Sequence, residues 1–238
     1  MSSQEIEVLV VGAGQAGVAM SEHLTGHGVP HLVLERHRIA ERWRSERWDS
    51  LVANGPAWHD RFPGLEFAGL DPDGFAAKEQ VADYFAAYAE KIGAPIRCGV
   101  EVTSVRRQAG RPGFLVETSD GIISARYVVA ATGPFQRPAI PAVIPDDAGL
   151  LSLHSSSYRN PGQLPDGAVL VVGAGSSGVQ IAAELRDLCI DRQRLAIGPH
   201  DGAVILLLPV QRISPLPVEN SVSPVPDRLP RQRTRLAG

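Results

Sequence analysis

The stretch VLVVGAGQAGVAM, residues 8–20, joins an apolar run to a loop of glycines near the start of the chain. Ile6–Val11 is short and rich in Val and Ile, which is typical of a parallel strand buried on both faces. Residues 18–28 then read as a helix that ends at Gly26 or Gly28. Three glycines follow the strand at GxGxxG spacing: Gly12, Gly14 and Gly17. This order predicts the opening strand–loop–helix unit of a doubly wound α/β fold.

The loop has the residues that a phosphate site requires. Gly12 allows the tight turn, Gly14 lets the backbone approach a pyrophosphate, and Gly17 lets helix and strand pack closely. Gln15 and Ala16 lie between these glycines and are also assigned to the site, and the N-terminus of the following helix offers free N–H groups and a positive dipole end to phosphate. A bare GxGxxG arises by chance roughly 0.2 times in a chain of this length and glycine content, so its context decides.

The context is a second strand, His31–Glu35, which ends in a carboxylate. Glu35 lies about twenty residues beyond the loop, where such a side chain accepts hydrogen bonds from the ribose hydroxyls of an adenine dinucleotide. We therefore predict a dinucleotide site that also includes the next residue, Arg36. The glycines themselves leave FAD and NAD open.

The segment after this strand, residues 35–58, contains three short motifs: Trp43-Arg44, Asp49-Ser50-Leu51 and Asn54-Gly55-Pro56. In this order they resemble the corresponding segment of the class B type of flavin-dependent monooxygenases. That family includes the flavin-containing and Baeyer–Villiger monooxygenases and related bacterial FAD/NAD(P)-dependent oxidoreductases. The resemblance implies FAD rather than NAD at the first loop.

The resemblance also implies roles for particular side chains. Trp43, Arg44 and Asp49 would line FAD. Asn54 would lie near the reactive face of the flavin, where an amide can stabilise the oxygenated flavin electrostatically. A structural interpretation stays open beside this one: Trp43 and Trp48 would pack beneath a loop, and the arginines would form a solvated face.

The middle of the chain predicts a helix and a small sheet. Residues 78–93 place four apolar side chains on one helical face, which we assign to the core: Val81, Tyr84, Phe85 and Tyr88. Alternating patterns then predict an antiparallel meander over about residues 97–128, with a turn at Asp120-Gly121. By resemblance, Val102 touches the adenine. The last strand leads to Thr132 and Gly133, at a carboxyl end where ligands of open α/β sheets bind.

The stretch VLVVGAGSSGVQI, residues 169–181, repeats the first fingerprint. Its loop residues are Gly173, Gly175, Ser176, Ser177 and Gly178. Two such loops indicate two cofactors, with FAD on the first and a nicotinamide dinucleotide on the second. Hydride would then pass from the nicotinamide to the flavin, and reduced flavin would meet O2. The resemblance implies NADPH, whereas the residues leave NADH open.

His154, Tyr158 and Arg159 precede the second loop and resemble a His-x-x-x-aromatic element of the same family. The fuller family signature has a Phe-x-Gly upstream, and this sequence lacks the Phe. We expect His154 to orient the linker between the two domains. Proton transfer at the reacting centre is its alternative role, which would make it catalytic together with Asn54.

Composition argues against several other functions. A net charge of −3 disfavours a nucleic-acid partner, and no apolar run approaches the length of a membrane span. Cys98 and Cys189 form no CxxC pair, which argues against a metal site, a disulfide scaffold and the dithiol chemistry of pyridine-nucleotide disulfide reductases. The first residues lack the basic start and cleavage site of a signal peptide, so a cytoplasmic location is expected.

These patterns predict a two-dinucleotide-binding Rossmann-type α/β flavoprotein with a small antiparallel β insertion and an incomplete second nucleotide domain. The FAD-binding domain is expected at 1–150 and the start of the NAD(P)-binding domain at 151–201. Residues 202–238 read as a disordered tail rich in Pro and Arg, in which the apolar run at 203–210 could form one strand. The resemblance covers 6–201, and we expect a family member truncated at its carboxyl end.

The leading functional expectation is an FAD-dependent, NADPH-reduced monooxygenase that acts on a small organic substrate with O2, or a truncated remnant of one. Two alternatives stay open: a flavin reductase or dehydrogenase without oxygenation, and a catalytically defective dinucleotide-binding protein. Neither the substrate nor the oligomeric state follows from the sequence.

Overall fold

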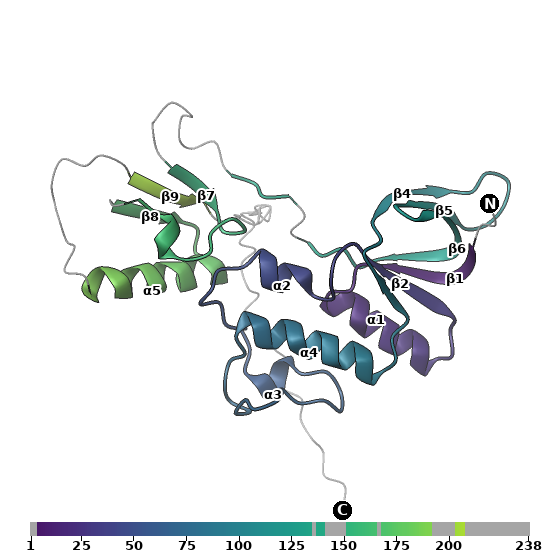
Figure 1. Cartoon of the computed structure of the whole chain (residues 1–238), viewed down its shortest axis with the longest axis horizontal. Helices are drawn as coiled ribbons and strands as arrows, with labels where there is room; N and C mark the ends of the chain where they lie inside the picture. The colour runs from purple at the N-terminus through teal and green to yellow at the C-terminus, as the bar shows by residue number, and fades with distance from the viewer. Residues whose placement is uncertain (1–3, 135–136, 141–150, 166–167, 192–202, 208–238) are drawn as a thin grey trace, which may run out of the picture.

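The protein folds around two sheets, which Figure 1 shows on opposite sides of the molecule. The computed structural model describes residues 4–134, 137–140, 151–165, 168–191 and 203–207. The larger sheet has six strands and the smaller has three. Each contains a strand that leads into a glycine loop and then a helix, so the predicted repeat of strand, loop and helix is confirmed.

The larger sheet combines a parallel and an antiparallel part. Its strands are β1 (Gln4–Val11), β2 (His31–Glu35), β3 (Ile96–Cys98), β4 (Val102–Arg107), β5 (Phe114–Thr118) and β6 (Gly121–Ala130). They lie in the order β3-β2-β1-β6-β5-β4, parallel from β3 to β6 and antiparallel from β6 to β4. The antiparallel part therefore begins at Val102 rather than near residue 97, because Ile96–Cys98 pairs in parallel with β2.

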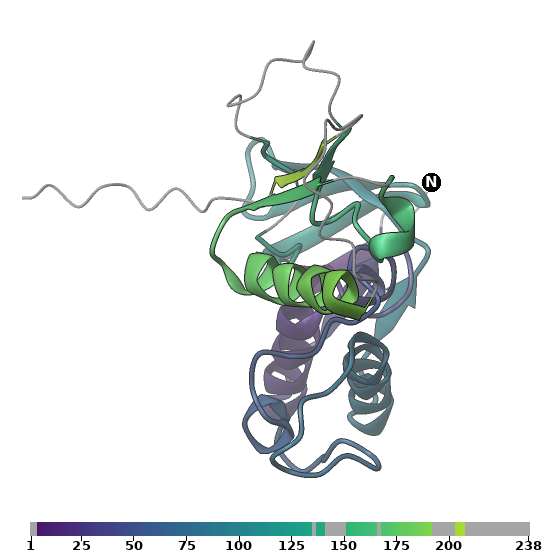
Figure 2. The ribbon, with the colours of Figure 1, turned by 90° about the vertical axis from the view of Figure 1, so that its left-hand side faces the viewer.

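The long helix α1 (Gln15–Gly26) lies against this sheet, and a second long helix, α4 (Lys78–Lys91), lies beside α1 (Figures 1 and 2). Val18 of α1 packs against Tyr88 of α4, and Val8 and Val10 of β1 share a core cluster with residues of α1. All four α4 side chains assigned to the core are buried, which confirms that assignment. No helix in the described part of the chain is both long enough and apolar enough to cross a membrane.

The connection between β2 and α4 holds two short helices, α2 (Glu41–Ser45) and α3 (Ala57–Asp60). α2 begins after Ala40, which is buried and has a left-handed φ of 57°. The N–H of Ala40 donates to the carbonyl of Ala13 at 3.1 Å. This hydrogen bond ties the start of α2 to the first glycine loop, so the side chains of α2 lie close to that loop.

The smaller sheet is parallel throughout, in the order β7-β9-β8. Its elements are β7 (Leu151–His154), the 3-10 helix η1 (Pro161–Gln163), β8 (Ala168–Val172), α5 (Ser176–Asp191) and β9 (Ala203–Leu207). The predicted boundary at 201/202 thus falls just before a strand of this sheet, formed by the apolar run. The rest of the predicted tail, 208–238, lies outside the described residues.

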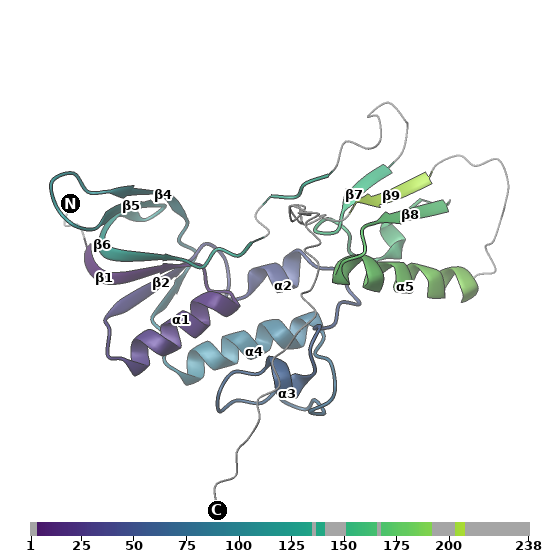
Figure 3. The same ribbon diagram turned by 180° about the vertical axis from the view of Figure 1, so that it is seen from behind.

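A buried cluster joins the two parts of the molecule at the point where α5 approaches the connection after α2 (Figure 3). Trp48 and Leu51 come from the first part, and Tyr158 and Ile181 come from the second. The N–H of Asp49 also donates to the carbonyl of Arg159 at 2.7 Å. The segment that leaves α2 is therefore held by side chains and backbone of both parts.

Candidate cofactor site

The first glycine loop lies where the carboxyl ends of β1, β2 and β6 meet. Gly12 N–H donates to the Leu34 carbonyl at 2.7 Å, which fixes the loop to the end of β2. Ala131 N–H donates to the Val11 carbonyl at 2.9 Å, which fixes the chain after β6 to β1. From β1 the chain winds outward through β2 to β3 and later returns on the other side of β1 at β6, so this edge is the switch point at which open α/β sheets bind ligands.

The loop glycines fit their predicted roles. Gly12 has a φ of 105°, and a Cβ there would lie 2.5 Å from the Ala131 carbonyl oxygen. A Cβ on Gly17 would lie 1.8 Å from the Gly12 carbonyl oxygen. A Cβ on Gly14, in contrast, meets no protein atom within 4 Å. Gly12 and Gly17 are thus required by the protein itself, whereas Gly14 faces open space that a cofactor can enter.

A pocket of about 510 Å³ opens beside this loop. It lies within the size range of small-molecule and cofactor sites. Of the residues predicted from the sequence, it is lined by Gly12, Gly14, Gln15, Ala16, Glu35, Arg36, Trp43, Val102, Thr132 and Gly133. No side chain caps α1 and no acidic residue lies in its first turn, so the positive end of this helix is available to phosphate. The residues therefore fit an adenine dinucleotide.

Glu35 is oriented by two backbone hydrogen bonds. Its Oε2 accepts from Ala13 N–H at 2.8 Å, and its Oε1 accepts from His37 N–H at 2.9 Å. Each carboxylate oxygen can accept a further hydrogen bond. The side chain is therefore held in the pocket with acceptor capacity left for a ribose hydroxyl, and its contact with ribose stays a prediction.

Several pocket residues were missed by the sequence reasoning. They are Val11, Leu34, His37, Ala40, Glu41, Arg42, Arg47, Val100, Glu101, Ala131 and Pro134. Arg42 and Arg47 belong to the arginine-rich segment for which the sequence leaves a solvated face open as an alternative. No pattern in the sequence singles out these two arginines, and the contact that orients Arg47, with its guanidinium carbon 5.9 Å from the centre of the Trp43 ring, is visible only in the structure.

Three other predicted cofactor neighbours lie outside the pocket. Arg44 Nη2 contacts Asp83 Oδ1 of α4 at 2.7 Å. Asn54 Oδ1 accepts from Gln180 Nε2 of α5 at 3.4 Å. Asp49 also lies at the junction between the two parts, as described next. Contact between these side chains and FAD therefore stays a prediction, and in this structure they face α4 and α5.

Asp49 connects three elements of the junction. Its Oδ1 accepts from Lys78 Nζ at 2.9 Å, and its Oδ2 accepts from Asn160 Nδ2 at 2.7 Å. The Asn160 amide and the Lys78 ammonium hold the pKa of Asp49 below its usual value. The carboxylate is therefore stabilised in its charged form, as a structural link between the two parts.

The second glycine loop repeats the geometry of the first. Gly173 has a φ of 116°, close to the 105° of Gly12. Val179 N–H donates to the Gly175 carbonyl at 3.1 Å, as Val18 N–H donates to the Gly14 carbonyl at 3.0 Å. Ser176 and Ser177 begin α5, and the third glycine, Gly178, is buried while Gly173 and Gly175 are exposed. The backbone of the second loop thus resembles that of the first, and binding of a second dinucleotide there stays a prediction.

His154 lies at the end of β7, outside the pocket of the first loop. It is buried, and its Nδ1 accepts from Ser156 N–H at 3.1 Å and lies 2.8 Å from Ser156 Oγ. Because Nδ1 accepts a backbone hydrogen bond, the neutral ring carries its proton on Nε2, which has no hydrogen-bond partner among the described residues. Burial lowers the pKa of His154. His154 is thus held by its own turn, and both its role in the linker and its role in proton transfer stay predictions.

The lowered pKa of His154 predicts a pH effect on stability. At pH below about 6.5 the unfolded chain takes up a proton that the folded His154 resists, so stability falls as pH drops through this range and levels off below the folded pKa. We expect His154→Asn, which keeps an acceptor for Ser156, to reduce this dependence. Chemical denaturation of both proteins between pH 8 and 5 checks it, and equal slopes would contradict the assignment.

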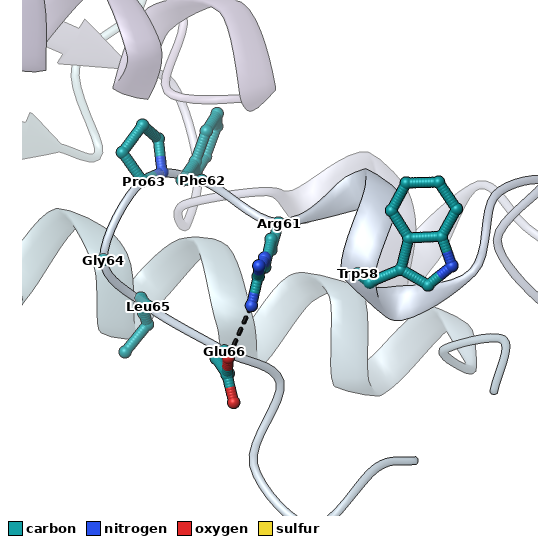
Figure 4. A pocket seen from close by; sticks show the side chains of 7 residues that line it. All are labelled: Trp58, Arg61, Phe62, Pro63, Gly64, Leu65 and Glu66. Carbon is teal, nitrogen blue, oxygen red and sulfur yellow. Dashed lines mark hydrogen bonds and ion pairs between the residues drawn. The ribbon is translucent and has the colours of Figure 1, made fainter. Parts of the chain in front are cut away.

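A further hollow of about 510 Å³ lies beside α3, and Figure 4 shows the side chains that line it. Arg61 and Glu66 form an ion pair across it, while Trp58 stands apart and is half exposed. It shares no residue with the pocket at the glycine loop. In the described part of the chain no group of three or more His, Cys, Asp or Glu side chains could hold a metal ion.

Comparisons with known proteins place the chain in a family. A family model described as pyridine nucleotide-disulphide oxidoreductase matches residues 9–189. An "Uncharacterized oxidoreductase CzcO-like" of Geobacillus kaustophilus is 42% identical over 184 residues, which cover 76% of this chain and 52% of that protein. The indole-3-pyruvate monooxygenase YUCCA1 of Oryza sativa is 33% identical, over 74% of this chain and 44% of that protein. The chain thus spans about half the length of the curated relatives it matches.

The solved structures agree on the fold. A mutant flavin monooxygenase from Stenotrophomonas maltophilia has a TM-score of 0.69 and 27% identity, over 77% of this chain and 55% of that chain. The sequence has no CxxC pair, so the residues for dithiol chemistry that the family's name suggests are not in this chain. With both glycine loops inside the matched residues, the chain belongs to the pyridine nucleotide-disulphide oxidoreductase family and is similar to flavin-dependent monooxygenases.

Proposed function

We propose that the chain binds FAD at the first glycine loop and NADPH at the second, and that it takes part in flavin-dependent monooxygenation of a small organic substrate with O2. Similarity to flavin monooxygenases supports this reaction class. The observation that carries the proposal is the pocket at the converging strand ends, because it gathers the predicted cofactor residues around one open loop. The cytoplasmic location expected from the sequence stays a prediction.

FAD, when bound, would supply the redox chemistry by accepting a hydride from the nicotinamide and delivering electrons to O2. The side chains and backbone of this chain bind and orient it. The first-turn amides of α1 are suited to the pyrophosphate, and the Glu35 carboxylate is suited to the ribose. Trp43 supplies an apolar wall that keeps water away from this part of the pocket.

A visible absorption spectrum of the purified, desalted chain tests the first cofactor, and anaerobic addition of NADPH tests the second. We expect a flavin spectrum that bleaches when NADPH is added, because hydride passes from one cofactor to the other. A chain that stays colourless after incubation with FAD would refute the FAD assignment. A flavin spectrum that NADPH and NADH leave unchanged would refute a working second site.

Oxygen then separates monooxygenation from simple flavin reduction. In air, we expect NADPH consumption with a panel of small organic substrates to give an oxygenated product for at least one of them. Hydrogen peroxide is measured in the same reactions. Hydrogen peroxide equal to the NADPH consumed with every substrate would identify a flavin reductase instead.

A further inference from the structure

Arg47 is a pocket residue with an unusual surrounding. It lies just after α2, and it lines the same pocket as the first glycine loop. Its Nη1 donates to the Glu46 carbonyl at 3.1 Å, and its guanidinium lies over the Trp43 ring at 5.9 Å. These two contacts fix the direction of the side chain, so little conformational entropy is lost when a ligand meets it.

Arg47 differs from the neighbouring arginines in its ion pairing. Arg38, Arg42 and Arg44 each form an ion pair, with Glu41, Glu46 and Asp83 respectively. Among the described residues Arg47 has no such ion pair. Burial lowers the pKa of Arg47, and the charges of Arg42 and Arg159 lower it further while Glu46 opposes them. The pocket therefore contains a partly desolvated positive charge that an anion would stabilise.

We propose that Arg47 binds the pyrophosphate of the dinucleotide at the first loop. This assignment adds a cofactor residue that the sequence motifs do not include, and it rests on the proposed function. The adenine, the riboses and the oxidised flavin ring carry no charge at pH 7, so the pyrophosphate is the one permanent anion of FAD. A guanidinium can donate two parallel hydrogen bonds to phosphate oxygens. Arg47 would thus complement the open amides at the start of α1.

The test measures binding of FAD and of ADP to the full chain, because the two ligands share the pyrophosphate while ADP lacks the flavin. Flavin fluorescence quenching gives the FAD dissociation constant, and calorimetry gives that of ADP. Arg47→Gln is expected to weaken both ligands by roughly tenfold or more, as loss of a charge-assisted hydrogen bond does. Arg106→Gln removes the same charge from an exposed position on β4 and is the matched control, expected to stay within about twofold.

Two more variants make the test specific. Arg47→Lys keeps the charge without the planar fork, and we expect its affinity for both ligands to lie between those of the wild type and Arg47→Gln. If Arg47→Gln proves unstable in a melting experiment, the affinity of Arg47→Lys relative to the wild type provides the test. Arg44→Gln tests the residue that the family resemblance favours. A larger loss of ADP affinity in Arg44→Gln than in Arg47→Gln would overturn the assignment.

The remaining outcomes are distinct. Unchanged ADP and FAD affinities in a folded Arg47→Gln would overturn the proposal, and so would a loss confined to FAD, which would place Arg47 against the flavin. A chain that binds ADP through Arg47 but takes up no FAD would support the pyrophosphate contact and refute the proposed function. A wild-type chain that binds neither ligand would refute both.

Discussion

Gly14→Ala is expected to weaken FAD binding strongly while the chain stays folded. Gly14 has a φ of −84° and a ψ of −167°, which alanine adopts without strain. Its added Cβ meets no protein atom within 4 Å and instead occupies the space that a pyrophosphate needs. We expect the FAD dissociation constant to rise roughly 100-fold, the equivalent of about 3 kcal/mol of steric conflict.

Gly17→Ala is the matched variant with the opposite expectation for stability. Its Cβ would lie 1.8 Å from the Gly12 carbonyl oxygen, a backbone atom that cannot rotate away. We expect the free energy of unfolding to fall by about 3 kcal/mol or more. Thermal melting and FAD titration of both variants check the pair. Equal melting temperatures, or full FAD binding in a folded Gly14→Ala, would contradict the assigned roles.

Tyr158→Ala is expected to separate the two parts of the molecule. Tyr158 is fully buried in the junction cluster with Trp48, Leu51 and Ile181. Its hydroxyl donates to Glu184 Oε2 of α5 at 2.7 Å. Removing such a side chain costs about 3–5 kcal/mol, and the loss falls on the contacts that hold α5 against the connection after α2.

Hydrogen exchange of the amides in α5 and α4 measures this effect. We expect Tyr158→Ala to speed exchange in α5 much more than in α4, because α4 packs within the larger part. Tyr158→Phe keeps the ring and loses only the hydrogen bond to Glu184. We therefore expect it to lower the free energy of opening of α5 by a smaller amount, about 1–3 kcal/mol. Uniform acceleration in both helices would show that the junction is not a separate unit.

The glycine loops and their flanking elements could be predicted because each rests on a short local pattern. Val8, Leu9 and Val10 are apolar in a row, and the strand they form is buried on both faces. The apolar face of α4 follows from its helical period. In contrast, β3 has three residues, too few for a period to emerge, so its parallel pairing with β2 was visible only in the fold.

The position of Arg47 in the pocket could not be predicted, for a different reason. α2 has five residues, and its direction depends on the left-handed φ of Ala40 and on its bond to Ala13. Neither is visible in the sequence. The direction of this short helix and of the residues just after it decides which arginine faces the pocket, so Arg47 lines the pocket while Arg44 pairs with α4.

The parallel pairing of β1 with β6 has a consequence for the order in which the chain folds. Val8 pairs with Tyr127, and Ala131 closes the far side of the first glycine loop. Contacts between residues so distant in sequence slow folding, because closing the long intervening loop costs conformational entropy before the contacts form. During synthesis, when the ribosome releases residues from the amino terminus onward, β1 emerges before β6 and cannot pair with it until β6 has followed. The first glycine loop therefore takes its final form only after the residues up to Ala131 have left the ribosome.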